Sequence, residues 1–265
     1  KLAMADRDEY YGDPAFVQVP LRALLSDEYT ALRRPLIDMR SASLEARPGD
    51  PRQMKPLKAN GVFRPGIGGT TTCVIADRWG NVVAATPSAN VPSSLTDAGA
   101  AGVTYGNRLR SLNTTPGHPN CIQPGKRPRI TLTPTIVLKD GRPAFAISVA
   151  GGDLQDQATL NLLLDAIDFG MEPAEAVRVP RFATSHHQDS FNPDRDRERT
   201  FIKAGSLKIS DRVSAEVRDE LARRGHAVET SATPIAVPVM LSINHETGLC
   251  RAAGDPDAKR HAAGL

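Results

Sequence analysis

The stretch from Gly68 to Asp77 reads GGTTTCVIAD and separates two kinds of sequence. The segment before it, residues 47–69, is rich in proline and glycine and predicts a loop. The threonines and apolar β-branched residues after it favour a strand. A loop that enters an edge strand is the ordinary interpretation of such a junction. The alternative is that the hydroxyl of Thr70 is a nucleophile, because a threonine at a chain terminus carries its own base in the α-amine.

The composition is that of an ordinary globular protein. The 265 residues are 40% hydrophobic and 24% charged, so the core needs no disulfide or metal to hold it together. The net charge of +3 is spread along the chain, so we expect no nucleic-acid partner, and no apolar run is long enough for a membrane span. The three cysteines form no metal-ligand spacing, so we expect no metal and no cofactor.

The first residues predict neither a signal peptide nor a natural start, because the chain begins with Lys1 and soon reaches a mixed-charge run. We therefore expect the later part of a longer protein. The cellular compartment is not indicated. We also expect that the fold needs the upstream part, since the predicted helices are too few to complete each helical layer.

Helical and strand patterns alternate in groups along the chain. The expected helices span residues 19–37 (as two short helices), 156–169, 174–179 and 211–225. The expected strands span residues 70–76, 82–87, 133–139, 144–150, 182–186, 200–203, 237–244 and 249–253. Because the strands come as antiparallel hairpins with helices between them, the pattern predicts an α+β fold with helices layered on sheets.

Two further expectations concern packing. In the helix at 156–169, the apolar side chains Leu160, Leu163, Leu164 and Ile167 recur at helical spacing and are expected to face the core. Residues 91–123 are polar and rich in glycine and proline, so they are expected to form a long surface excursion.

The first predicted hairpin brings polar side chains close to Thr70. A four-residue turn sets Thr70 about opposite Ala89, so Ser88 and Asn90 become its neighbours. None of the six histidines lies in a position typical of a catalytic triad, and each is expected at the surface. The base would then be the α-amine of a terminal Thr70, whose ordinary pKa of about 8 suits neutral pH. This requires the bond between Gly69 and Thr70 to be cut.

Gly151 and Gly152 lie between a predicted strand and a predicted helix. The ordinary interpretation is a tight turn. The functional alternative is that backbone N–H groups exposed at this turn stabilise an oxyanion, because glycine allows close approach of a ligand to the backbone.

Taken together, these residues resemble the γ-glutamyltransferase family of N-terminal-nucleophile hydrolases along nearly the whole chain. The family's small subunit begins with two threonines followed by the pattern DxxGN, which here is Asp77, Gly80 and Asn81 and places the nucleophile on Thr70. Other similar segments, in the family's order, are ADR at 5–7, YGDP at 11–14, GKRP at 125–128, TPTIV at 133–137, GG at 151–152, DFGM at 168–171, EAV at 175–177, PRF at 180–182 and DP at 255–256.

The resemblance implies a four-layer αββα sandwich and self-cleavage before Thr70. Residues 1–69 would then be the end of the large-subunit region, including the linker before the cut, and residues 70–265 the small catalytic subunit. The implied partners are the large-subunit portion of the same precursor and a small-molecule amide. By position, Ser88 matches the hydroxyl that hydrogen-bonds the nucleophile, Asn90 a substrate-binding amide, and Gly151 with Gly152 the oxyanion hole.

The departures from the family lie where it binds substrate. Thr131, preceded by isoleucine, stands where the family has a serine pair. The segment NRLRS at 107–111 has no carboxylate where the family holds the γ-glutamyl α-amine, so Ser111 lies in the expected pocket and Asp153 or Asp156 is a candidate replacement. Arg108 and Arg110 in the same segment can instead pair with a carboxylate.

Three hypotheses follow. The first is a γ-glutamyltransferase-like amide hydrolase or acyltransferase with Thr70 as nucleophile. The second keeps this mechanism for a different acyl group, as in the related cephalosporin acylases. The third is a catalytically silent homologue that acts as an interaction subunit.

Overall fold

The computed structural model describes residues 1–56, 70–88, 100, 106–194, 199 and 203–264. Its α-helices are α1 (Leu2–Tyr10), α2 (Leu21–Leu24), α3 (Asp27–Arg33), α4 (Gln155–Ile167), α5 (Pro173–Ala176) and α6 (Ala215–Arg223). Its strands are β1 (Gly49–Asp50), β2 (Lys55–Pro56), β3 (Cys73–Ala76), β4 (Val82–Ala85), β5 (Thr135–Lys139), β6 (Arg142–Ala150), β7 (Phe182–Ala183), β8 (Ser206–Ser210), β9 (Ala227–Ser231), β10 (Val237–Asn244) and β11 (Leu249–Gly254). The predicted pair of short helices is confirmed, and Ser26 Oγ caps α3 by accepting from the Tyr29 N–H at 3.1 Å.

The centre of the fold is a four-stranded antiparallel sheet in the order β11-β10-β6-β5. β5 and β6 are joined by Asp140 and Gly141, whose φ angles of 53° and 76° are those that a two-residue hairpin turn requires. β6 lies inside the sheet, and its residues 146–150 are all buried. The predicted hairpins formed by β5 with β6 and by β10 with β11 are therefore confirmed.

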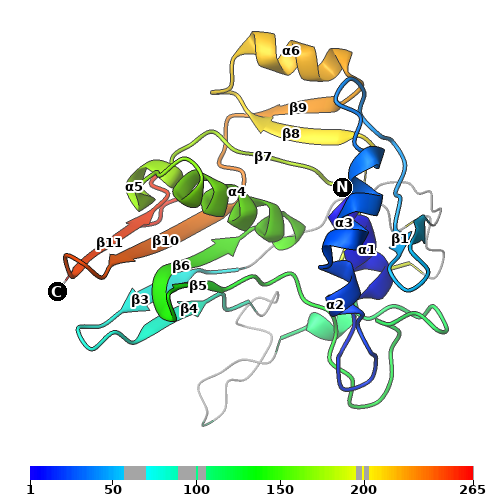
Figure 1. The fold of residues 1–265 in the computed structure, drawn as a ribbon, viewed down its shortest axis with the longest axis horizontal. Coiled ribbons are helices and arrows are strands. Elements are labelled where there is room, and N and C mark those ends of the chain that lie inside the picture. The colour runs from blue at the N-terminus through cyan, green and yellow to red at the C-terminus, as the bar shows by residue number, and fades with distance from the viewer. Residues whose placement is uncertain (57–69, 89–99, 101–105, 195–198, 200–202, 265) are drawn as a thin grey trace.

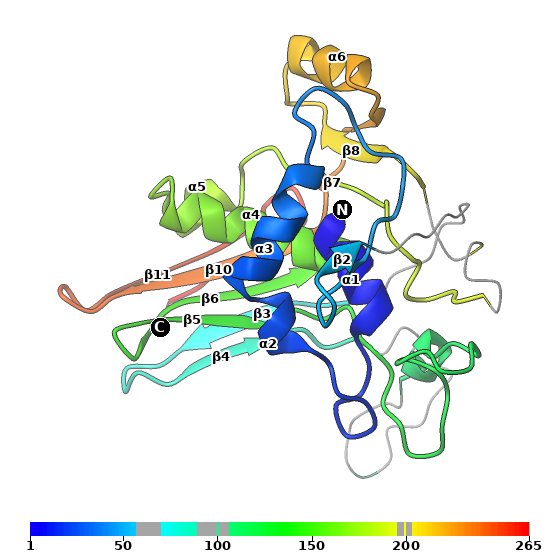
Figure 2. The same cartoon turned by 45° about the vertical axis from the view of Figure 1, so that its right-hand side comes forward.

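Helices α4 and α5 cover one face of this sheet, and the β3–β4 hairpin covers the other (Figures 1 and 2). On the helix side, Ile147 and Val149 of β6 pack with Leu162 of α4 and Met240 of β10 in a buried hydrophobic cluster. The predicted α+β class is confirmed. The helices α4 and α5, the central sheet and the β3–β4 hairpin form three successive layers of an αββα sandwich. On the outer face of the hairpin, Ile75 and Val83 are exposed.

A buried polar contact joins the hairpin to the central sheet. Ser148 of β6 points toward the hairpin, where its hydroxyl donates to the carbonyl of Ala85 at 2.8 Å. The same oxygen lies 2.8 Å from the hydroxyl of Thr86, which therefore donates to it. Because alternate residues of a strand face opposite sides, one strand serves an apolar interface with the helices and a hydrogen-bonded interface with the hairpin.

The predicted inner face of the helix at 156–169 is wrong. Leu160, Leu164 and Ile167 are exposed, whereas the buried stripe is Ala158, Leu162 and Ala166, with Leu163 only partly buried against the core. Alanines at both ends of this stripe let α4 approach the sheet closely. Apolar spacing alone cannot choose between two stripes on a helix whose residues are mostly apolar.

The region after α5 also differs from the prediction. β8 and β9 are parallel and are joined through α6, so the expectation that all strands form antiparallel hairpins is wrong here. Parallel neighbours need a crossover connection, which α6 supplies. β7 is shorter than predicted and pairs with β8. The strand expected at 200–203 falls mostly outside the described residues, and Lys203 belongs to no strand.

The described part of the predicted surface excursion, residues 106–123, is partly buried. Ser111, Leu112, Asn113 and Asn120 are each at most 8% exposed. The side-chain amide of Asn120 donates to the Ser111 carbonyl at 2.6 Å, and the Asn113 N–H donates to the Asn120 carbonyl at 3.0 Å. The polar residues that suggested a solvated loop instead satisfy its backbone groups, which permits burial. Among the described residues, no helix is long and apolar enough to cross a membrane.

Candidate active site

The β3–β4 hairpin sets Thr70 opposite Ser88. Ala76 pairs with Val82, so the register differs by one residue from the predicted one that set Thr70 opposite Ala89. The turn has five residues because Asp77 closes it twice: its N–H donates to the Asn81 carbonyl at 3.0 Å and its carboxylate accepts from the Asn81 N–H at 2.9 Å.

The hydroxyls of the two facing residues are in contact. Thr70 Oγ1 lies 2.9 Å from Ser88 Oγ, and both side chains are half-buried. The Thr71 N–H donates to the Pro87 carbonyl at 3.0 Å, so the pairing continues beyond β3 to the candidate nucleophile. This contact is the geometry that the sequence predicted for a nucleophile and its hydrogen-bonding partner. Asn90, the other predicted neighbour, lies outside the described residues.

Arg108 joins this pair from the 3-10 turn Arg108–Ser111. Its Nη2 donates to Ser88 Oγ, and its guanidinium lies over the ring of Phe191 with 5.0 Å between Cζ and the ring centroid. Burial and the nearby charge of Arg110 lower the pKa of Arg108, but an arginine stays protonated at neutral pH. A fixed positive charge therefore lies two hydrogen bonds from the Thr70 hydroxyl.

The Gly151–Gly152 turn reaches the same cluster through Phe191. Gly152 has a φ of 61°, and a Cβ placed on it would lie 3.0 Å from Cε2 of Phe191. At Gly151 the φ is 154°, and an added Cβ would lie 3.2 Å from the Cβ of Ala236. Both positions need glycine for their conformation and for close contacts. The ring of Phe191 thus lies close to both the glycine turn and Arg108.

Gln155 connects Thr131 to this turn through hydrogen bonds. The side-chain amide of the fully buried Gln155 donates to the carbonyls of Val149 at 2.8 Å and Thr131 at 3.0 Å. The Gln155 side-chain oxygen accepts from the Gly152 N–H at 3.3 Å. The hydroxyl of Thr131 is buried and has no partner among the described residues. Thr131 therefore carries an uncommitted hydroxyl close to the glycine turn.

Asp153 lies in a buried charge cluster. Its Oδ1 accepts from Arg7 Nη1 at 2.9 Å and from the Ser190 hydroxyl at 2.6 Å, while its Oδ2 accepts from the Ser190 N–H at 3.1 Å. Burial opposes its ionisation, but Arg7 and the other positive groups outweigh it and hold the pKa of Asp153 well below its usual range. Both oxygens are thus engaged within the protein, and a role for Asp153 in binding substrate stays a prediction.

Arg110 and Ser111, the other predicted site residues of the 107–111 segment, make hydrogen bonds within the protein. Arg110 donates from Nε to the Phe191 carbonyl at 2.8 Å and from Nη2 to Asn192 Oδ1 at 2.6 Å. Ser111 is buried and is tied through its carbonyl to Asn120. Their predicted role in substrate binding is not tested by these contacts.

The segment around Phe191 was not predicted from the sequence to lie at the candidate site or to be buried. His186 and His187, expected at the surface, are 4% and 1% exposed. Burial lowers the pKa of His186 to about 4, and its Nδ1 accepts from the Gly205 N–H at 2.9 Å. The only available signal was the density of polar residues with paired histidines just before Phe191, which is unusual for a loop that carries no function.

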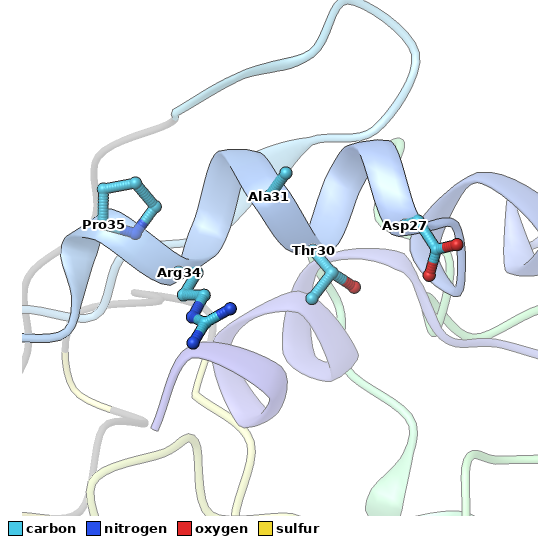
Figure 3. Close-up of a pocket in the computed structure, with 5 residues that line it drawn as sticks. All are labelled: Asp27, Thr30, Ala31, Arg34 and Pro35. Atoms are coloured by element: carbon cyan, nitrogen blue, oxygen red, sulfur yellow. The ribbon is translucent and has the colours of Figure 1, made fainter.

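Two further features contribute nothing to this site. Among the described residues, no group of three or more His, Cys, Asp or Glu side chains is placed to hold a metal ion. A hollow of about 480 Å³ opens beside α3 and is lined by Asp27, Thr30, Ala31, Arg34 and Pro35, as Figure 3 shows. None of these five residues is a candidate site residue.

Comparisons with known proteins agree with the resemblance. The family model described as Gamma-glutamyltranspeptidase matches residues 1–265. The chain is 33% identical over 273 residues to the glutathione hydrolase proenzyme of Bacillus subtilis strain 168, covering 100% of the chain and 43% of that protein. It is 31% identical over 232 residues to the acylase ACY 1 proenzyme of Pseudomonas sp. strain SE83, covering 87% of the chain and 36% of that protein.

A similar structure is that of LmbA2991HD, with a TM-score of 0.83 and 33% identity over 100% of the chain and 47% of that protein. The chain spans less than half the length of the curated relatives that it matches here.

Proposed function

Because the chain belongs to the gamma-glutamyltranspeptidase family, we propose that it is part of a proenzyme that cuts itself before Thr70 and then uses Thr70 to cleave an amide. The observation that carries the proposal is the 2.9 Å contact between Thr70 Oγ1 and Ser88 Oγ at the end of the hairpin. The relatives are named as proenzymes, which supports the autocatalytic step. Residues 1–69 would form the C-terminal end of the first product, and residues 70–265 would belong to the second.

Self-cleavage is an acyl shift followed by hydrolysis. The Thr70 hydroxyl adds to the carbonyl of Gly69, its proton passes to the Thr70 nitrogen, the bond from that carbonyl to the nitrogen breaks, and an ester on the Thr70 side chain results. Water then hydrolyses the ester and leaves a carboxylate on Gly69 and a free amine on Thr70. Ser88 supports this step because its hydroxyl can donate to the attacking oxygen.

The same atoms would then act on the substrate. The free α-amine of Thr70 takes the proton of the Thr70 hydroxyl, which attacks the amide carbonyl of the substrate. The N–H groups of the Gly151–Gly152 turn are the candidates for stabilising the oxyanion, and the Gly152 N–H would exchange its 3.3 Å hydrogen bond to the Gln155 side-chain oxygen for one to the oxyanion. Loss of the amine leaves an acyl ester on Thr70, which water or an acceptor amine resolves. Hydrolysis and transfer differ only in this last acceptor.

The chain offers a matched control for the test, because Thr71 is an exposed neighbour of Thr70. Intact-mass analysis of the full-length protein is expected to show two products that separate before Thr70. Thr70→Ala should remain in one piece, and Thr71→Ala should split as the wild type does. A wild-type protein that stays whole after long incubation contradicts the proposal and favours a silent homologue.

The second candidate is an acylase for an acyl group other than γ-glutamyl. It is favoured by the positive charge of Arg108 beside Ser88, where a γ-glutamyl ammonium would have to be tolerated. Rates with γ-glutamyl and other acyl anilides separate the two candidates. Turnover of only the other anilides would exclude the transferase.

A further inference from the structure

The candidate reacting groups are carried by strands of two different sheets. Thr70 and Ser88 lie at the open end of the β3–β4 hairpin, and the Gly151–Gly152 turn follows β6 of the central sheet. Among the described residues no strand ladder links β4 to β6, although the two strands pack against each other. The distance from the Thr70 hydroxyl to the N–H groups of the turn therefore depends on how side chains join the hairpin to the sheet.

The hydrogen bonds of Ser148 lie just before both groups in the sequence. Thr86, which donates to Ser148 Oγ, is two residues before Ser88, and Ser148 is three residues before Gly151. An extended chain advances about 3.3 Å per residue, so this contact is about 7 Å along the chain from Ser88 and about 10 Å from the turn. Residues two apart in an extended chain face the same side, so Ser88 follows Thr86 toward the central sheet.

The contact restrains the hairpin in two directions. Ser148 is fully buried and Thr86 is 6% exposed, so solvent does not compete for either hydrogen bond. Ser148 bonds to the backbone carbonyl of Ala85 and to the side chain of Thr86, each at 2.8 Å. Hydrogen bonds weaken steeply when they are misaligned, whereas apolar contacts are not directional. Ser148 therefore opposes both a slide of β4 along the sheet and a rotation of β4 about its own axis.

We infer that the Thr86–Ser148 pair positions the two halves of the candidate active site. It sets the distance between the Thr70 hydroxyl and the N–H groups of the Gly151–Gly152 turn, which must both reach one carbonyl of the substrate. Thr86 and Ser148 are not among the reacting groups, so both act through Ser88 and the turn. The inference rests on the proposed function of Thr70 and of this turn.

Self-cleavage and substrate turnover should depend on the pair differently. Self-cleavage uses the Thr70 hydroxyl and Ser88, which the hairpin itself holds together. Turnover of a substrate also needs the glycine turn at the correct distance from Thr70. Loss of the pair should therefore slow turnover and leave self-cleavage close to the wild-type rate. A variant that only weakened the fold would not separate the two reactions.

Ser148→Ala and Thr86→Val each remove one hydroxyl of the pair from the full-length protein. We expect kcat to fall by about tenfold to a hundredfold, because a displacement of about 1 Å caused by a remote change can lower a rate about a hundredfold. KM should stay within about threefold of the wild-type value. The factor in kcat should be equal for γ-glutamyl anilide and butyryl anilide, where the wild type turns over both, since the oxyanion is common to them. The rate of self-cleavage, followed by intact mass, should stay within about threefold.

Three controls locate the effect. Thr86→Ser keeps the hydroxyl and should keep kcat within about threefold of the wild type. The double variant should lose about as much as Ser148→Ala alone, because both hydroxyls act through one contact.

The matched control is Ser231→Ala, at the end of β9 in a different sheet. Ser231 is 7% exposed, and its hydroxyl donates to the Thr233 carbonyl at 3.0 Å, so the change removes the same atoms from a similarly bonded, buried serine. The free energy of unfolding in urea should fall about as far as that of Ser148→Ala, while kcat stays unchanged.

The outcomes separate this inference from the proposed function. Unchanged kcat in Ser148→Ala overturns the inference, and so does a kcat that falls equally in Ser231→Ala. Equal slowing of self-cleavage and turnover overturns it as well, because the effect would then lie within the hairpin. A rise in KM at constant kcat would assign the pair to substrate binding and contradict it too. All four results leave the proposed function standing, whereas a wild-type protein that neither splits nor turns over any acyl anilide overturns the proposed function itself.

Discussion

The buried cluster around Arg7 offers a sharp test of what holds the two parts of the chain together. Arg7 is 9% exposed, and its guanidinium reaches Asp8 at 3.0 Å, Asp153 at 2.9 Å and Asp156 at 3.1 Å. Arg7 and Asp8 precede the proposed cut, whereas Asp153 and Asp156 follow it. We predict that Arg7→Met, which keeps an unbranched apolar stem and removes the guanidinium with its charge, destabilises the protein strongly.

The contacts set the size of the effect. Removing one member of a buried ion pair costs about 3 to 5 kcal/mol, because the remaining charge is left uncompensated. Here Asp8 keeps Arg129 and the N–H of Gln188 at 2.7 Å, and Asp153 keeps Ser190. The loss should therefore fall at the lower end of this range, at about 3 kcal/mol.

The pH dependence follows from the two carboxyls. Although burial opposes ionisation, Arg7 lowers the pKa of both Asp8 and Asp153. A carboxyl whose folded pKa is depressed stabilises the fold fully above its unfolded pKa of about 3.9, and this contribution is lost progressively as the pH falls from there through the folded pKa. The deficit of Arg7→Met should accordingly be complete at pH 7 and shrink below about pH 4.

Equilibrium urea unfolding of the full-length protein measures the deficit at both pH values. The control is Arg251→Met, since Arg251 pairs with Glu172 at 3.4 Å and both side chains are about half exposed. Such a surface pair is worth at most about 1 kcal/mol. If the free energy of unfolding of Arg7→Met falls by no more than that of Arg251→Met, the predicted role of the Arg7 cluster is wrong. Equal deficits at pH 7 and at about pH 2 would show that the loss comes from packing and not from charge.

Three further predictions concern single positions. His186 is neutral in the fold, with a pKa of about 4 against about 6.5 when unfolded, so it contributes stability above pH 6.5 that is lost as the pH falls toward 4, and His186→Asn should flatten the melting temperature over this interval. Gly152→Ala should cost about 1 to 3 kcal/mol in thermal unfolding, more than Gly170→Ala, because both have a positive φ and only Gly152 has an atom within 4 Å of an added Cβ. Ser88→Ala should slow self-cleavage by about a hundredfold in a mass time course, since it removes the hydrogen bond to the Thr70 hydroxyl, and a wild-type rate would contradict this role.

The helical side of the fold shows where sequence patterns were too weak. Spacing placed the leucines of α4 in the core, but the buried stripe contains Ala158 and Ala166. The depth to which a helix sinks onto a sheet depends on the facing residues, here Ile147 and Val149, which are not its sequence neighbours. The same limit explains why the burial of His187 was missed.

Local features were determined by the sequence alone. The Asp140–Gly141 turn, the cap at Ser26 and the contact between Thr70 and Ser88 each depend on residues that lie within a single hairpin or helix turn, where backbone chemistry decides the geometry. For that reason, predicting four instead of five residues in the β3–β4 turn shifted the predicted partner of Thr70 by only one position, from Ser88 to Ala89.

Only the tertiary structure decided the surroundings of the candidate nucleophile. Phe191 lies close to both Arg108 and Gly152, and Arg7 meets Asp153 although almost 150 residues separate them in the chain. Such contacts depend on how whole layers pack, and neither residue type nor spacing encodes which partner a buried charge will find. The sequence therefore indicated which residue is the candidate nucleophile, while the fold decided that the positive charge of Arg108 lies beside its partner Ser88.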